Sequence, residues 1–76
     1  MKNLIKVERA RYNLTQEQLA DILGISRQSI HAIEARRFVP STLLALRMAK
    51  LFNLKVEELF KLEESEIGFQ EPLKIE

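Results

Sequence analysis

The chain has no cysteine and no tryptophan, and only one histidine, two glycines and two prolines among its 76 residues. Without cysteine it can form neither disulfides nor thiolate metal sites, and one histidine cannot complete a structural zinc site. No apolar run approaches the roughly 18 residues that mark a membrane-spanning helix, and no secretory leader is evident. We therefore expect a cytoplasmic protein with no metal, no other cofactor and no membrane partner.

The chain is long enough for one domain and not for two. A domain of this size buries only about 60% of its unfolded surface, so a second copy would add to its stability. The net charge is +1, but its distribution is uneven. Residues 1–37 hold seven basic and four acidic side chains, whereas residues 38–76 hold five and seven. The first half is thus the one expected to face an anion.

The most informative stretch is 15–34, which reads TQEQLADILGISRQSIHAIE. Thr15 with Gln18 three residues later forms a capping box, which predicts a helix over 16–23. The inner face of this helix is expected to consist of Leu19, Ala20 and Leu23.

A turn and a second helix follow directly. Gly24 supplies the positive φ that the turn needs, and Ser26 is a good N-cap for a helix over 27–35. Ile30 and Ile33 are expected to anchor this helix from its buried side. Two short amphipathic helices joined in this way form a helix-turn-helix, a unit that places its second helix in the major groove of DNA.

Three more helices are predicted around this unit, over 3–12, 42–52 and 56–62. The inward residues expected of the first are Leu4, Ile5 and Val7; of the second, Leu43, Leu44, Leu46, Ala49 and Leu51 or Phe52; and of the third, Val56, Leu59 and Phe60. Residues 36–40 read RRFVP and form a basic loop. The remaining acidic segment is irregular, with a brief strand-like alternation of Ile67 and Phe69, then Leu73 and Ile75.

From Lys2 to about Leu62 the chain resembles the Cro/XRE-type (lambda-repressor-like) helix-turn-helix family, and in particular its short stand-alone regulators. The resemblance is carried by Gln16, Ala20, Gly24, Ile25, Ile30 and Ile33, and by the segments SRQSIHAIE, PS, LALRMAKLF and VEELF in family order. It implies an all-α, five-helix bundle over 1–62. Residues 63–76 would be an acidic tail that is disordered or contributes to dimerisation.

The resemblance also implies a homodimer on a pseudo-palindromic operator and a buried ion pair between Arg9 and Glu34. The chain departs from the family pattern at two positions of the loop. Arg36 lies where a glycine commonly follows the helix over 27–35, and Val39 lies where asparagine often precedes the proline.

Four residues of the predicted groove helix are candidates for contact with DNA bases. Arginine can make two parallel hydrogen bonds to guanine and glutamine two to adenine, which indicates such roles for Arg27 and Gln28. Ala32, one turn further on, can at most touch a thymine methyl group. His31 can reach a base or a phosphate. The alternative for all four is a solvated polar face.

Phosphate contacts are expected from Gln16, Ser29, Arg36 and Arg37. Gln16 opens a helix whose free N–H groups also favour an anion. Its alternative role is capping. For the two arginines the alternative is a solvated loop with Phe38 packed into the core.

Phe60 and Leu62 are the candidates for a dimer interface, with burial in the core as the alternative. The alternating tail could pair as strands across the dimer or be disordered.

The leading hypothesis is a sequence-specific transcriptional regulator that acts as a repressor on double-stranded DNA, with no small-molecule ligand evident. One alternative is the antitoxin of a toxin–antitoxin pair, whose tail would fold onto the toxin. Another is a protein-interaction module that does not bind DNA. An enzyme is not expected, because no nucleophile–base pair, phosphate loop or metal cluster is present.

Overall fold

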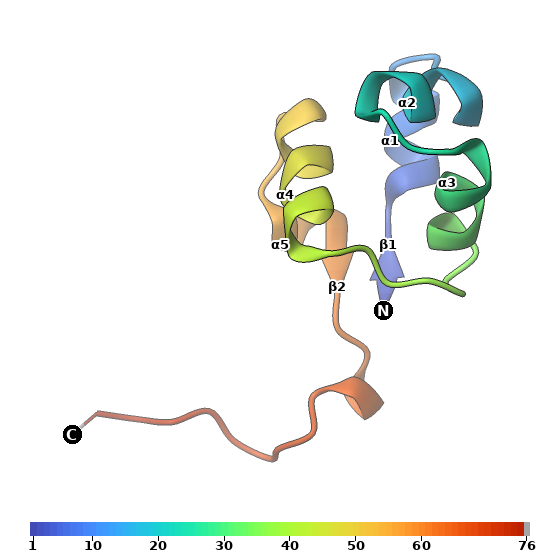
Figure 1. The fold of residues 1–76 in the computed structure, drawn as a ribbon. Helices are drawn as coiled ribbons and strands as arrows, with labels where there is room; N and C mark the ends of the chain where they lie inside the picture. Colours follow the sequence, from blue (N-terminus) through green and yellow to red (C-terminus); the bar gives the residue numbers. More distant parts are fainter. Residues whose placement is uncertain (76) are drawn as a thin grey trace.

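The computed structural model describes residues 1–75, so Glu76 of the expected tail lies outside it. The elements run in the order β1 (Lys2–Asn3), α1 (Ile5–Arg11), α2 (Gln16–Leu23), α3 (Arg27–Glu34), α4 (Thr42–Leu51), α5 (Val56–Leu59), β2 (Phe60–Lys61) and the 3-10 helix η1 (Glu64–Glu66). The expected helical bundle is confirmed, with α1, α2 and α3 grouped on one side and α4 and α5 on the other (Figure 1).

Hydrogen bonds at the helix ends explain where α2 and α3 begin. The Thr15 hydroxyl accepts a hydrogen bond from the Gln18 backbone N–H (3.0 Å), and the Gln18 side-chain oxygen accepts one from the Thr15 N–H (2.9 Å). Gly24 ends α2 with φ 71°, and the Ser26 hydroxyl accepts from the Ser29 N–H (3.1 Å) to start α3. The predicted helix-turn-helix is therefore present, with the predicted caps.

The core lies between the two groups of helices, and each of α1 to α5 contributes to it. Its largest fully buried side chains are Ile5, Leu19, Ile30, Ile33, Met48 and Leu59. Full burial of an aliphatic side chain contributes about 1.5–3 kcal/mol. Ala20 and Leu23 are also buried, so the inward faces predicted for α2 and α3 are confirmed.

The helix expected over 3–12 starts later than predicted. Asn3 belongs to β1, and its side-chain oxygen accepts a hydrogen bond from the Ile5 N–H (3.2 Å), which sets the beginning of α1. The Asn3 side-chain N–H donates to the carbonyl of Ile33 (2.9 Å). One asparagine thus starts the first helix and ties it to α3.

The inner face of α1 was also predicted only in part. Ile5 is buried as expected, but Leu4 and Val7 are exposed. Glu8, three residues after Ile5, is 4% exposed and lies 3.5 Å from the Arg11 guanidinium. Helix geometry puts residues three apart on one face, so position 8 turns inward although it carries a carboxylate.

The inner face of α4 also differs from the prediction. Its buried residues follow the helical period and are Ala45, Met48, Ala49 and Phe52. Leu43 and Leu46 were expected inside and are exposed, and of the alternatives Leu51 and Phe52 the structure buries Phe52. A leucine-rich helix has apolar residues on more than one face, and only packing selects the face that is buried.

The fifth helix ends at Leu59, three residues earlier than predicted. The chain continues as β2, which pairs antiparallel with β1 so that Asn3 lies opposite Phe60. Phe60 is 6% exposed and belongs to the core, so its candidacy for the dimer interface is wrong. Leu62 is 64% exposed. Residues 60–61 form a strand because β1, which is distant in sequence, supplies the backbone hydrogen-bonding partners.

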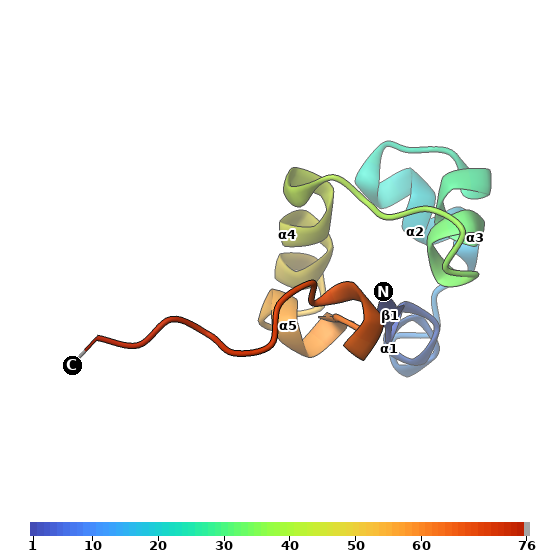
Figure 2. The ribbon, with the colours of Figure 1, turned by 90° about the horizontal axis from the view of Figure 1, so that it is seen from below.

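Within residues 63–75, the ion pairs of the tail with the body are at its root. Glu66 accepts a hydrogen bond from the N-terminal ammonium (2.8 Å), and Glu63 lies 3.5 Å from Arg36. Beyond η1 the chain runs away from the body in an extended path and forms no strand as far as Ile75 (Figures 1 and 2).

Arg36 is held in a left-handed conformation, with φ 62°. Its N–H donates to the Ile33 carbonyl (3.0 Å) just past the end of α3. This conformation costs a residue with a side chain about 1–2 kcal/mol, whereas glycine adopts it freely. The family pattern of glycine at this position has this physical basis.

We therefore expect Arg36→Gly to raise the free energy of unfolding by about 1 kcal/mol relative to Arg36→Ala, which lacks the same charge but keeps the strain. Chemical denaturation of both variants measures the difference. Equal stabilities would contradict a strained Arg36.

Acid should release the root of the tail. The hydrogen bond from the N-terminal ammonium, helped by the Glu63 backbone N–H, lowers the pKa of Glu66 below its ordinary 4.5. A lowered folded pKa means that this contact stabilises the fold above the unfolded pKa and is lost as pH falls through the folded one. NMR titration should show tail resonances shifting below pH 4.5 in the wild type, with the Glu66 component absent in Glu66→Gln.

Candidate nucleic-acid interface

One side of α3 is buried and the other is open. Ile30 and Ile33 anchor the helix in the core, while Arg27, Gln28 and His31 are exposed and Ala32 is half-buried. Because the buried pair fixes the rotation of the helix about its axis, the polar side chains are presented in a set orientation.

A shallow hollow of about 420 Å³ brings most of the predicted contact residues together. It is lined by Arg27, Gln28, His31, Ala32 and Arg37. The first four are the base-contact candidates, and the fifth comes from the loop after α3. The α3 helix and the neighbouring cation of the loop thus lie side by side. Such a surface can reach both the floor and the edge of a groove in a partner molecule.

Arg37 is joined to α3 by its backbone and by its side chain. Its N–H donates to the Ala32 carbonyl (2.9 Å), and its guanidinium lies 3.4 Å from Nε2 of His31. The neighbouring Phe38 is 51% exposed, so the alternative in which it packs into the core is wrong.

An ion pair organises the other side of α3. Nε of Arg9 lies 2.9 Å from one carboxylate oxygen of Glu34, and Nη2 lies 3.1 Å from the other, so the contact is bidentate. The remaining guanidinium nitrogen donates to the Leu14 carbonyl (2.8 Å). With side-chain exposures of 16% and 8%, both charges are mostly withdrawn from water.

Gln16 takes part in this network, which sequence reasoning did not anticipate. Its side-chain N–H donates to Glu34 at 3.4 Å, a long hydrogen bond that leaves the second N–H of the amide available. A second hollow, of about 490 Å³, adjoins the first and shares Arg27 and His31 with it. Gln16 lies on its border.

Lys6 also borders this second hollow, although the sequence prediction treated it like any other surface lysine. The available signal was its spacing, because Lys6 and Arg9 are three residues apart on α1 and so share a face.

Two of the predicted phosphate contacts lie outside both hollows. The Ser29 hydroxyl is 2.9 Å from that of Ser26 and is occupied at the start of α3. Arg36, turned by its left-handed backbone, faces Glu63 of the tail rather than the hollow. Adjacent arginines of the loop therefore have different surroundings.

Nothing in the described chain suggests a bound metal or a membrane span. Residues 1–75 contain no cluster of three or more histidine, cysteine or carboxylate side chains placed to hold an ion. None of the helices described is both long enough and apolar enough to cross a membrane.

Comparison with known sequences identifies the family. Residues 5–59 match the family model described as helix-turn-helix. The chain belongs to the Cro/XRE-type helix-turn-helix family. The predicted resemblance is thereby confirmed, and several relatives that are 40% or more identical to the chain are named helix-turn-helix-type transcriptional regulators.

Relatives occur in archaea, bacteria and a phage. An uncharacterized helix-turn-helix-type regulator of Methanocaldococcus jannaschii is 52% identical over 66 residues, which is 87% of this chain and all of the relative. YgzD of Bacillus subtilis, likewise a regulator of this type, is 48% identical over 84% of this chain and 97% of its own length. The ImmF control region 10 kDa protein of Bacillus phage phi105 is 41% identical over 74% and 62%.

Removing one partner of the Arg9–Glu34 pair should destabilise this helix-turn-helix protein strongly. Glu34→Ala leaves a mostly buried guanidinium without its carboxylate, and we expect a loss of about 3–5 kcal/mol in the free energy of unfolding. Gln16→Ala, which removes a long contact to the same carboxylate, should cost about 1 kcal/mol or less. Urea denaturation of the two variants measures both values, and similar losses would show that the ion pair is not the stronger contact.

Proposed function

We propose that this protein is a homodimeric, sequence-specific repressor that acts in the cytoplasm on a pseudo-palindromic operator, with α3 in the major groove. The observation that carries the proposal is the hollow in which four α3 residues and Arg37 meet on one exposed face. The membership of the family supports DNA binding. The phage relative, named for a control region, supports regulation of gene expression.

Base reading is assigned to the start of α3. Arg27 can donate two parallel hydrogen bonds to N7 and O6 of guanine, and Gln28 can pair with N6 and N7 of adenine. One turn later His31 and Ala32 extend the same face, and the Ala32 methyl group suits a thymine methyl. The buried pair on the opposite side of the helix keeps these side chains in register with successive base pairs.

Phosphate contacts flank the base-reading residues. Gln16 stands at the N-terminus of α2, where its free side-chain N–H and the unpaired backbone N–H groups favour an anion. Arg37 supplies a cation on the other flank, and Ser29 adds a hydroxyl. Arg36 can join only by exchanging Glu63 for phosphate, since these two side chains are 3.5 Å apart.

The proposed dimer surface lies at the end of the molecule where the loop and the tail meet. Leu62 remains a candidate, and exposed Val39 and Leu43 can join it. The Arg36–Glu63 contact supports this grouping, because it holds the loop before Val39 close to the residue after Leu62. A dimer of the family kind would set the two α3 helices about one turn of DNA apart, ~34 Å.

The test is binding to an operator selected from random DNA, together with the DNA upstream of the protein's own gene. Fluorescence anisotropy at two salt concentrations separates the contributions. Gln28→Ala should weaken specific binding by about 1–3 kcal/mol and relax specificity at one base pair. Arg37→Ala should weaken binding to all sequences and reduce the log–log salt slope by about 0.9.

Lys55→Ala is the matched control, because Lys55 is exposed at the start of α5, away from α3. It should leave specific affinity unchanged. Failure to bind any DNA, even at low salt and with the fold intact, would overturn the proposal and favour a protein-interaction module.

A further inference from the structure

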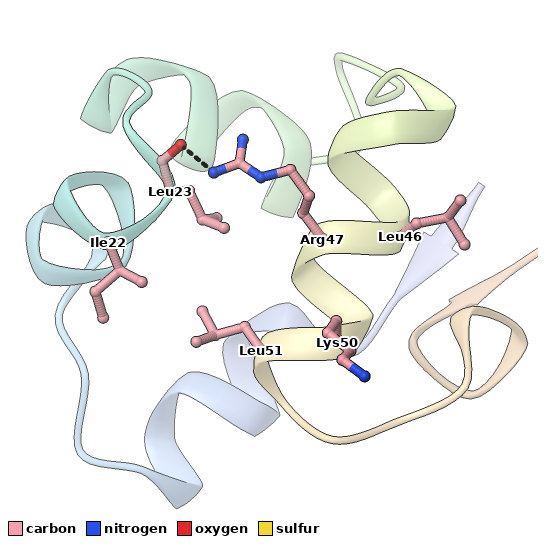
Figure 3. A pocket seen from close by; sticks show the side chains of 6 residues that line it. All are labelled: Ile22, Leu23, Leu46, Arg47, Lys50 and Leu51. Carbon is pink, nitrogen blue, oxygen red and sulfur yellow. Dashed lines mark hydrogen bonds between the residues drawn. The ribbon is translucent and has the colours of Figure 1, made fainter.

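A third exposed hollow, of about 450 Å³, lies between α2 and α4 and shares no residue with the two hollows at the α3 face. Figure 3 shows its lining: Ile22 and Leu23 from α2, and Leu46, Arg47, Lys50 and Leu51 from α4. Ile22 and Leu51 project into the space between the helices, and the Arg47 guanidinium donates to the Leu23 carbonyl (2.9 Å). We call this hollow the α2–α4 groove.

The groove continues an apolar stripe along the outside of α4. Leu43 and Leu46 are exposed one turn apart, and Leu51 reaches the groove at the end of the helix. The stripe thus starts at the proposed dimer surface, which includes Leu43. The groove is rimmed by two cations, Arg47 and Lys50, and neither makes an ion pair with a carboxylate of residues 1–75.

The tail has the complementary chemistry. Leu73 and Ile75 are fully exposed and Phe69 largely so, an unfavourable arrangement for three large apolar side chains. Glu71 lies between Phe69 and Leu73 and carries the charge opposite to that of the rim, whereas Lys74, between Leu73 and Ile75, has the same sign as the rim. The tail is extended, so it can follow a surface without first unfolding any element (Figures 1 and 2).

The geometry favours the groove of another copy over the tail's own groove. The tail leaves the body below β2, whereas its own groove lies toward the top of α2 and α4 in Figure 1. Its root, held by Arg36, lies at the proposed dimer surface. The ten residues of α4 span about 15 Å, and the seven residues 69–75 reach about 23 Å when extended. A tail that crosses this surface can therefore run along the partner's α4 to its groove.

We propose that residues 69–75 of one copy occupy the α4 stripe and the α2–α4 groove of a second copy, with Glu71 between Arg47 and Lys50. This inference rests on the homodimer of the proposed function. It assigns the tail a role in dimerisation that is separate from DNA contact.

The absence of cysteine from the chain allows a cross-linking test without background. Leu46→Cys and Leu73→Cys, combined in the full-length chain, place a thiol in the groove and one on the tail. Oxidation should give covalent dimers on a non-reducing gel at least about tenfold faster than the control pair Glu17→Cys with Leu73→Cys, because docking raises the local thiol concentration. Glu17 is exposed on α2 but does not line the groove.

Charge reversal tests the complementarity. Glu71→Lys in the cross-linking variant should slow dimer formation severalfold, and adding Lys50→Glu should restore it. A fast-migrating monomer would show that the tail folds onto its own groove, and a rate equal to the control would show that it docks on neither. Either result overturns the inference.

Sedimentation and DNA binding of the wild type separate this inference from the proposed function. A dimer that binds DNA but fails to cross-link removes only the tail assignment. A chain that sediments as a monomer removes the homodimer and the tail assignment together, and the anisotropy measurement then tests DNA binding alone.

Discussion

The mostly buried ion pair between Arg9 and Glu34 connects the elements that hold the exposed α3 face in place. The same guanidinium reaches the Leu14 carbonyl just before α2, so one side chain positions α1, the start of α2 and the end of α3. Gln16 also donates to the Glu34 carboxylate and is thereby placed beside α3. A helix held at its end in this way keeps its orientation, and orientation is what allows side chains to distinguish base edges.

The two short strands also help to hold α3 in place. Asn3 donates to the Ile33 carbonyl, and β1 is in turn paired with β2. The family match covers 5–59, so both strands lie outside it. The small sheet nevertheless closes the core over Phe60. A bundle this small has little apolar surface to bury, and four residues of strand at its end complete it.

The two arginines of the basic loop have different surroundings. Arg37 faces the α3 hollow, while Arg36 faces the acidic root of the tail. The left-handed backbone at Arg36 is the cause, since it turns successive side chains in different directions. The acidic second half of the chain thus meets the basic first half through Arg36 and the N-terminal ammonium, next to the surface proposed for dimerisation. The surfaces proposed for DNA binding and for dimerisation are consequently adjacent in this molecule, although they use different residues.

Local rules were sufficient for the helix-turn-helix. The capping box at Thr15, the positive φ of Gly24 and the Ser26 cap depend on neighbours within three or four residues, and all were predicted correctly from the sequence. The exposure of the polar first turn of α3 was also predicted correctly, because Ile30 and Ile33 indicate which side of the helix is buried.

The rest depended on contacts between distant segments. Leucines occur around α4, so its buried face was chosen by packing and could not be inferred from periodicity alone. Phe60 became a core residue because β2 found a partner near the N-terminus, and Glu8 was buried by the helical phase that Ile5 imposes. The amino-acid sequence by itself thus determined the motif and its chemistry. The tertiary structure selected the faces and the closing sheet, because those choices depend on contacts between distant segments and not on the sequence within a single helix.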